Sequence, residues 1–204
     1  MLWSPLESID PPIPNPMIMT LILVGLSLSL LGFLHRIPVI ENWDARTFHF
    51  LHAFLRRGSA FFRFIWPLGT TPVAILLIAM TFLQGSRTGW LFSLAYGLAA
   101  VGERIIKMRM QRLRPFQARV GVQMGQPSRP GDPSHPSGDA MRAWYLALAL
   151  PAAFGLSWPV QLLAALAAAA LSLGRVALGV HYPLDVIAGA GLGLFAAGFA
   201  SLFL

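Results

Sequence analysis

The sequence predicts an all-α integral membrane protein, a single domain over residues 1–204 built as a bundle of six membrane-spanning helices. Hydrophobic residues make up 56% of the chain and charged residues 11%, against roughly 25% charged residues in an average soluble domain. Several uncharged stretches reach the ~18 to 20 residues that a helix needs to cross a bilayer. The formal net charge of +7 favours an anionic partner, but the hydropathy leaves no segment for a nucleic-acid-binding domain. The absence of cysteine excludes disulfides, thiolate metal sites and a thiol nucleophile.

The first span is predicted over Met17–Leu34, which carries no charge. The head before it contains five prolines, Glu7 and Asp10 but no Lys or Arg. A cleavable signal begins with basic residues, so we expect an uncleaved helix. Residues 35–63 then mix arginines with aromatic side chains, a pattern that predicts an amphipathic segment at the membrane interface. The alternative for this segment is a covered loop.

The remaining spans follow in order along the chain. Phe64–Ser86 and Thr88–Gly102 are uncharged and are predicted as the second and third. Ala143–Gly174 is uncharged for 32 residues, too long for one crossing, and the break at Gly155–Pro159 divides it into the fourth and fifth. Val186–Leu204 is the sixth. We expect three glycines of this last helix to be close-packing positions between helices: Gly191, Gly193 and Gly198.

The basic residues are distributed unequally between the two sides of the membrane. An even number of crossings places both termini on one side, and of the 15 Lys and Arg residues only Arg87 lies there. The positive-inside rule therefore predicts that the other side, with the first, third and fifth connections, faces the cytoplasm, with the protein in the cytoplasmic membrane. The opposite sidedness is kept open, because some of these charges are candidates for ligand binding.

Charged groups are costly at membrane depth, so the polar clusters at the ends of the spans are the informative residues. The first cluster runs from Lys107 to Arg114 and Pro115. Seven residues are nearly two helical turns, so we expect Lys107 and Arg114 to share a helix face, with Pro115 ending the element. The alternative is a basic patch that touches anionic lipid headgroups.

The second cluster, Ser134–Asp139, follows a loop rich in Gly and Pro and leads into the fourth span. Ser137 and Gly138 at a helix start would offer free backbone N–H groups to an anion. The alternative is an ordinary helix start, with Ser137 as the N-cap and Asp139 in the first turn.

The third cluster, Gly174–Asp185, contains Arg175 and a His–Asp pair. Pro183 suits the first turn of the sixth helix, which places His181 just before that helix and Asp185 in its opening turn. The carboxylate can then accept the Nδ1 proton of His181 and make Nε2 more nucleophilic. The alternative is an interfacial histidine without a chemical role.

Together the clusters supply three cations, a helix N-terminus and a His–Asp pair on one membrane face, an inventory that suits a phosphoryl group. We expect His181 to attack phosphorus and Asp185 to orient it. No carboxylate cluster for a metal is apparent in the sequence, so the cations are expected to replace magnesium and no cofactor is expected. The expected phosphate ligands are Lys107, Arg114, Ser137, the Gly138 amide and Arg175.

These residues resemble the PAP2 superfamily of membrane lipid phosphatases, the type-2 phosphatidic acid phosphatase family. The family motifs are Lys, six residues, Arg-Pro; then Pro-Ser-Gly-His; then Ser-Arg, five residues, His, three residues, Asp. The resemblance implies that His181 forms a phosphohistidine with the help of Asp185 and without a metal, and that the catalytic core covers residues 107–185. The matching residues of the first and third motifs are Lys107, Arg114 and Pro115, then Arg175, His181 and Asp185.

Two positions depart from the family pattern. Gly174 stands where the family has a serine, and Asp139 stands where it has the histidine that protonates the leaving oxygen. An ionised Asp139 cannot act as a general acid, and Arg142 at i+3 favours the ionised form. Three outcomes are open: Asp139 is held protonated and acts as the acid, His135 replaces it, or the substrate needs no acid.

The third outcome favours lipid diphosphates, because these expel a monophosphate that leaves without a proton, whereas a monoester must expel an alkoxide. The sequence thus predicts a metal-independent membrane phosphatase for lipid phosphates and diphosphates that prefers polyprenyl diphosphates such as undecaprenyl diphosphate. A lipid phosphotransferase and a non-catalytic lipid-phosphate-binding relative are the alternatives. The expected partners are the lipid substrate and membrane lipids, without nucleic acid or an obligate protein partner. Many bacterial relatives in this family work on the outer face of the cytoplasmic membrane. The distribution of basic residues instead predicts a site on the cytoplasmic face.

Overall fold

The computed structural model describes residues 15–204, and its secondary structure over this range is helical, as the sequence predicts. The head at residues 1–14, including its expected lack of a cleavable signal, lies outside the described residues. The α-helices are α1 Pro16–Gly32, α2 Pro38–Leu55, α3 Ser59–Ile65, α4 Thr71–Ala79, α5 Ser86–Met110, α6 Pro115–Ala118, α7 Gly138–Phe154, α8 Trp158–Ala177 and α9 Pro183–Ser201. Short 3-10 turns are η1 Phe33–Arg36, η2 Arg56–Gly58, η3 Trp66–Gly69 and η4 Met80–Gln84.

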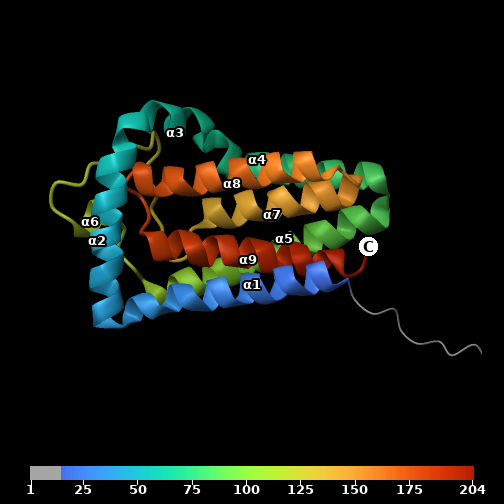
Figure 1. Cartoon of the computed structure of the whole chain (residues 1–204), viewed down its shortest axis with the longest axis horizontal. Coiled ribbons are helices and arrows are strands. Elements are labelled where there is room, and N and C mark those ends of the chain that lie inside the picture. The colour runs from blue at the N-terminus through green and yellow to red at the C-terminus, as the bar shows by residue number, and fades with distance from the viewer. Residues whose placement is uncertain (1–14) are drawn as a thin grey trace, which may run out of the picture.

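The long helices form a bundle that α2 crosses at one end (Figure 1). Helices α1, α5, α7, α8 and α9 run along the bundle axis, with α4 beside them, and the long connection between α6 and α7 lies at the same end as α2. The start of α1 and the C-terminus lie together at the opposite end. Arg87 is also at that opposite end, where its Nη2 donates to the carbonyl oxygen of Phe203 at 2.9 Å. The start of α1 and the C-terminus thus lie at the same end of the bundle, as an even number of crossings between them requires.

Within residues 15–204, three helices are long and apolar enough to cross a membrane. They are Pro16–Arg36, Trp158–Ala177 and Pro183–Ser201, with mean hydropathies of 2.4, 1.7 and 1.6. Pro38–Gly69 and Thr71–Gln84 form a fourth candidate when the pair, bent by 50°, is taken as one span. Helix α5 carries several charges in its last turns and α7 has 17 residues. The protein is therefore a membrane protein, and the count of six crossings stays a prediction.

The break predicted inside the long uncharged stretch is confirmed. Helix α7 ends at Phe154 because Gly155 adopts the left-handed conformation, with φ of 59°. Helix α8 then begins at Trp158, with Pro159 in its first turn, where the missing N–H of proline leaves no partner unsatisfied.

The stretch predicted as the second span, Phe64–Ser86, is not one continuous helix. The chain passes through the 3-10 turn η3, is extended at Thr70 with ψ of 156°, and only then enters α4. Pro67 and Pro72 lie in the first turns of η3 and α4, and a proline there starts a new helical segment because it cannot donate to the preceding turn.

The prediction that Lys107 and Arg114 share a helix face is wrong. Helix α5 ends at Met110, since Gln111 adopts left-handed dihedrals with φ of 50° and ψ of 28°. Arg114 is extended, as a residue before proline should be. Pro115 opens the short helix α6 instead of ending α5.

Helix α2 has two different faces, as expected for an amphipathic segment. The face toward the bundle buries Asp44, Ala45, Phe48 and His52. The outer face exposes large apolar side chains on a helix that lies across the bundle end (Figure 1). This geometry suits a helix in the plane of the lipid headgroups. The exposed residues are Val39, Trp43, Phe50 and Phe54.

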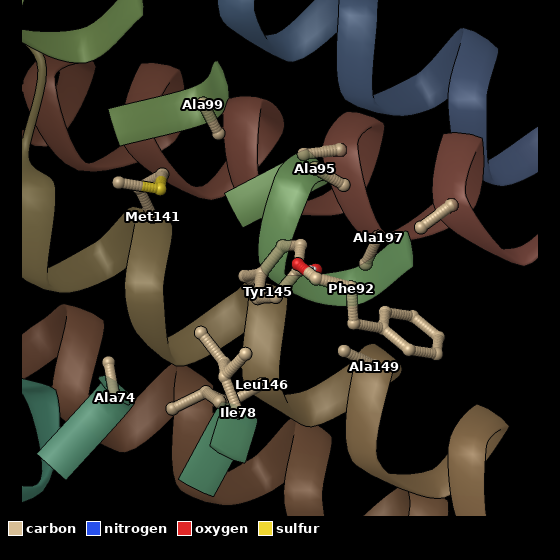
Figure 2. Packing of buried hydrophobic residues seen from close by; sticks show 12 residues of the cluster. Ala74, Ile78, Phe92, Ala95, Ala99, Met141, Tyr145, Leu146, Ala149 and Ala197 are labelled. Carbon is tan, nitrogen blue, oxygen red and sulfur yellow. Dashed lines mark hydrogen bonds between the residues drawn. The ribbon is translucent and has the colours of Figure 1, made fainter. Parts of the chain in front are cut away.

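The largest buried apolar cluster lies between α4, α5, α7 and α9. Figure 2 shows it around Tyr145, which is completely buried and whose hydroxyl donates to the carbonyl oxygen of Phe92 at 2.5 Å. Small residues let α9 approach its neighbours closely. A Cβ on Gly193 would overlap the carbonyl oxygen of Met141 on α7, and one on Gly191 would lie 2.5 Å from the nitrogen of Ser29 on α1. The expected close-packing role of these glycines is confirmed.

We expect Gly193→Ala to destabilise the bundle, because the added methyl group forces α7 and α9 apart. Overpacking costs roughly 1–3 kcal/mol, and the melting temperature in detergent should fall by about 3–10 °C. Gly97→Ala on α5 is the matched control, since nothing lies within 4 Å of its Cβ position. Equal melting temperatures for the two variants would contradict the packing account.

Candidate active site

One cavity of about 290 Å³ lies where the ends of several helices meet the connections between them. Helices α5, α7 and α8 and the loop before α9 each contribute to its wall. It brings together six of the residues expected from the sequence, which are the three cations, the helix-start glycine, the aspartate at the acid position and the nucleophile: Lys107, Arg114, Arg175, Gly138, Asp139 and His181. Further lining residues come from η3 and the start of α4, from the connection before α7, and from α7 itself: Trp66, Thr70, Thr71, Pro72, Gln126, Pro130, Asp132 and Arg142.

Two of the cations, Lys107 and Arg114, share one carboxylate, that of Asp132. Lys107, on the last turn of α5, has its Nζ 2.7 Å from the Glu103 carboxylate and also binds Asp132. The Nη2 of Arg114 lies 2.8 Å from Asp132 Oδ1. Burial favours the neutral form of Asp132, yet the charges of Lys107 and Arg114 hold its pKa well below its usual range. The Asp132 carboxylate therefore lies between the two cations, where phosphate oxygens were expected.

Arg175 keeps one hydrogen-bond donor without a partner. Its Nη2 lies 2.8 Å from Asp139 Oδ2 and also donates to Gln126. Its Nε is buried and has no hydrogen-bond partner among the described residues. Buried donors are almost always satisfied, so an unpaired guanidinium N–H beside a cavity is a group that an oxyanion can satisfy.

Asp139 is held between two guanidinium groups. Arg175 approaches it from α8, and Arg142 approaches from the next turn of α7. The Nε of Arg142 donates to the Gly69 carbonyl oxygen at 2.7 Å, which fixes this arginine against η3. Two cationic partners favour the ionised carboxylate. The geometry thus favours an ionised Asp139 over the protonated acid that was one of the open outcomes.

The tautomer of His181 follows from its neighbours. The Nη1 of Arg114 lies 2.9 Å from His181 Nε2. A guanidinium can only donate, so Nε2 must be the acceptor and Nδ1 must carry the proton. Burial, followed by the charge of Arg114, lowers the pKa of His181 to about 3. The imidazole is therefore neutral near pH 7, with its lone pair on the nitrogen that faces Arg114 in the cavity.

The expected direct hydrogen bond between His181 and Asp185 is not formed. The distance from His181 Nδ1 to Asp185 Oδ2 is 3.8 Å, because the carboxylate turns back to accept the backbone N–H of Tyr182 at 2.9 Å. Arg112 donates to the other carboxylate oxygen at 2.6 Å. The hydroxyl of Ser134 lies 2.6 Å from Asp185 Oδ2 and 3.4 Å from His181 Nδ1.

His135 is placed away from the reacting groups. Its Nδ1 lies 3.1 Å from Asp185 Oδ1, and its ring packs at 4.5 Å from the ring of His35. It is completely buried and does not line the cavity. This position does not support the alternative in which His135 replaces the missing acid.

Two motif positions lie outside the cavity wall. Ser137 is buried and caps α7, where its Oγ accepts the N–H of Ala140 at 3.4 Å, so its expected contact with phosphate is not supported. A Cβ on Gly174 would lie 3.1 Å from the Phe62 ring. The approach of α3 to α8 therefore leaves little room for a side chain at this position, where the family has a serine. Gly138, the other residue expected to bind an anion at this helix start, does line the cavity.

Several residues of the site were not identified from the sequence. Asp132 and Gln126 come from the long connection before α7, and a loop gives no periodic signal that would orient them. Arg142 was recognised from the sequence as a neighbour of Asp139, but its place in the cavity wall was not. Arg112 belongs to the basic run already identified, but its partner Asp44 on α2 is distant in sequence. Over residues 15–204, no three His, Asp or Glu side chains are grouped to hold a metal ion.

The fold and the site define a helical membrane protein with a cation-lined cavity beside a neutral histidine. The chain belongs to the PAP2 superfamily, whose family model matches residues 88–204. A decaprenylphosphoryl-5-phosphoribose phosphatase of Mycobacterium tuberculosis is 34% identical over 120 residues, which are 58% of this chain and 63% of the relative. An undecaprenyl-diphosphatase of Sulfolobus acidocaldarius is 34% identical over 122 residues, 58% of this chain and 55% of the relative. The matches thus span less than two thirds of these relatives.

Two solved structures have a similar fold. A PAP2-type phosphatidylglycerolphosphate phosphatase from Bacillus subtilis aligns with a TM-score of 0.69 and 22% identity, over 91% of this chain and 94% of that one. LpxE from Aquifex aeolicus aligns with a TM-score of 0.66 and 26% identity, over 78% of this chain and 94% of that one. The architecture of the whole bundle, beyond the region of the motifs, is therefore that of PAP2-type membrane proteins.

We expect Asp132→Asn to bind orthovanadate more tightly than the unmodified protein does, because the competing negative charge between Lys107 and Arg114 is removed. A gain of roughly tenfold, about 1.4 kcal/mol, is expected in calorimetric titrations. The depressed pKa keeps Asp132 ionised, so the ratio of the two affinities should stay constant between about pH 5 and 8.

The control for this titration is Glu41→Gln, which removes a half-exposed carboxylate of α2 outside this cavity. It should leave the affinity unchanged. Weaker binding by Asp132→Asn would mean that Asp132 positions the cations for the anion instead of competing with it.

Proposed function

We propose that this protein is a lipid phosphatase that removes the terminal phosphate of lipid phosphates and diphosphates through a phosphohistidine on His181. The observation that carries the proposal is one cavity lined by Lys107, Arg114, Arg175 and a neutral histidine with its lone pair on Nε2. The relatives named above support it, since their names describe phosphatases that act on polyprenyl compounds. This chemistry matches what the motif spacing predicts.

The first chemical step is attack of His181 Nε2 on phosphorus. The incoming phosphate replaces Asp132 as the partner of Lys107 and Arg114, and Arg114 then donates to a phosphate oxygen instead of to Nε2. The Nε2–P bond forms as the bond to the leaving oxygen breaks. The guanidinium of Arg175 and the Gly138 amide stabilise the charge on the equatorial oxygens.

The second step releases inorganic phosphate. Water attacks the phosphorus of the phosphohistidine, the N–P bond breaks, and the electron pair returns to Nε2 of His181. The proton of the water passes to solvent or to the released phosphate. A lipid or sugar hydroxyl in place of water would make the same intermediate a phosphotransferase, so the product distinguishes the two activities.

The preferred substrate class is a polyprenyl diphosphate. Asp139 occupies the position of the family's acid, and its two guanidinium partners favour the carboxylate, which has no proton to give. A diphosphate expels a monophosphate oxygen that needs no proton, whereas a monoester needs an acid worth ~10²- to 10⁴-fold in rate. An undecaprenyl-diphosphatase among the relatives supports this substrate class.

The connection before α7 supplies several cavity-lining residues, and it lies at the bundle end that α2 crosses (Figure 1). We place this end at headgroup level in the cytoplasmic membrane, since the exposed aromatic residues of α2 suit the lipid interface. Trp66 and Pro72 at the η3–α4 break line the cavity, so a prenyl chain can enter from the bilayer at this break. The charge distribution favours the cytoplasmic face.

We expect His181→Ala to abolish phosphate release, since no other imidazole lines the cavity within the described residues. Free phosphate is measured with purified protein and a polyprenyl diphosphate in the presence of a chelator. His49→Ala, on the exposed side of α2, is the control and should keep its activity. Release by His181→Ala at more than about 1% of the normal rate would remove this residue from the mechanism.

We expect Asp139→His to raise the ratio of monoester to diphosphate turnover by roughly 10- to 100-fold, because it restores a proton donor. Both rates are measured with phosphatidic acid and a polyprenyl diphosphate. Asp139→Asn removes the charge without supplying an acid and should leave the ratio unchanged. Comparable turnover of the two substrates by the unmodified protein would contradict the proposed preference.

A further inference from the structure

Three buried groups form a continuous hydrogen-bonded row behind the nucleophile. The hydroxyl of Ser134 is 3.4 Å from His181 Nδ1 and 2.6 Å from Asp185 Oδ2. The distance from His181 Nδ1 to Asp185 Oδ2 is 3.8 Å, too long for a direct hydrogen bond. Ser134 and Asp185 are completely buried and His181 is 2% exposed. The serine is therefore the nearest side-chain partner of Nδ1, and solvent has little access to replace it.

The direction of each hydrogen bond in this row is determined by the chemistry of its ends. Arg114 can only donate, so its contact at 2.9 Å with His181 Nε2 leaves the proton on Nδ1. An ionised carboxylate can only accept, so the hydroxyl proton of Ser134 points to Asp185. The Ser134 oxygen is then free to accept the Nδ1 proton. Only this arrangement satisfies all three partners.

Asp185 is prevented from moving closer to His181. One oxygen accepts the Tyr182 backbone N–H at 2.9 Å and the Ser134 hydroxyl at 2.6 Å. The other accepts Arg112 at 2.6 Å and lies 3.1 Å from His135 Nδ1. Arg112 is in turn anchored to Asp44 of α2 at 2.7 Å. These partners leave the gap between carboxylate and imidazole that Ser134 fills.

We propose that Ser134 is a positioning residue that connects Asp185 to His181, so that the nucleophile is oriented through a His–Ser–Asp row. The proposal rests on His181 being the nucleophile. When Nε2 bonds to phosphorus, positive charge develops on the imidazole while the proton stays on Nδ1. The Asp185 carboxylate polarises the Ser134 hydroxyl. The Ser134 oxygen then stabilises the positively charged imidazole by accepting a stronger hydrogen bond from its Nδ1–H. No bond to Ser134 forms or breaks.

The experiment compares Ser134→Ala, Ser134→Thr, Asp185→Asn and the Ser134→Ala/Asp185→Asn double variant. Phosphate release from a polyprenyl diphosphate gives kcat and KM, and melting in detergent reports folding. Ser134→Ala should lower kcat by roughly 10- to 100-fold with KM nearly unchanged, and Ser134→Thr, which keeps the hydroxyl, should recover most of the rate. The double variant should be no slower than Asp185→Asn, because the row is already interrupted.

Ser172→Ala is the control, since this buried hydroxyl on α8 contacts Trp144 outside the cavity.

A second readout does not require turnover. Nitrogen-15 NMR of histidine-labelled protein, with His181→Ala for assignment, reports the tautomer and hydrogen bonding of His181. The Nδ1–H signal should be present in the unmodified protein and should shift to weaker hydrogen bonding in Ser134→Ala but not in the Ser172→Ala control. An unchanged NMR signal, or multiplicative losses in the double variant, would overturn the proposal. Absence of phosphate release by the unmodified protein would instead refute the proposed function, while the NMR comparison still decides the role of Ser134.

Discussion

The structure depends on the compensation of charges that lie at the end of an apolar bundle. Lysine and arginine side chains there are costly without partners, and the part of the chain that the structure describes pairs Lys107 and Arg114 with Asp132, and Arg175 with Asp139. These pairings let a cationic cavity exist before substrate arrives. In the proposed function, phosphate would replace Asp132 as the anion between Lys107 and Arg114, so that these cations keep an anionic partner throughout.

The same need to pair buried charges connects helix α2 to the loop that carries His181. Arg112 lies between Asp44 of α2 and Asp185 of α9, and its guanidinium stacks 4.2 Å from the ring centre of Tyr182. The loop that carries His181 is therefore held by α2 as well as by its own helices. Helix α2 and the proposed nucleophile His181 are thereby connected through one buried ion-pair network.

The sequence predicted what periodicity and spacing determine. The uncharged stretches, the break at Gly155 and the helix start at Pro183 follow from hydropathy and turn chemistry, and the motif residues Lys107 and His181 do meet in one cavity. Side-chain directions after a helix ends were not predictable, because one left-handed residue, Gln111, redirects the chain. Loop residues such as Asp132 were missed for the same reason, since no repeating pattern orients them.

The two departures from the family pattern each have a structural counterpart, which argues against a site that has lost its function. The ring of Phe62 lies 3.1 Å from the Cβ position of residue 174 and leaves little room for a serine there, and Arg142 supplies a second guanidinium to Asp139. A site that drifts without selection loses its most costly residues first, and buried cations are the most costly here. Lys107 and Arg175 remain in the cavity wall. The retained cations and the adjusted acid position together favour a phosphatase adapted to a leaving group that needs no proton.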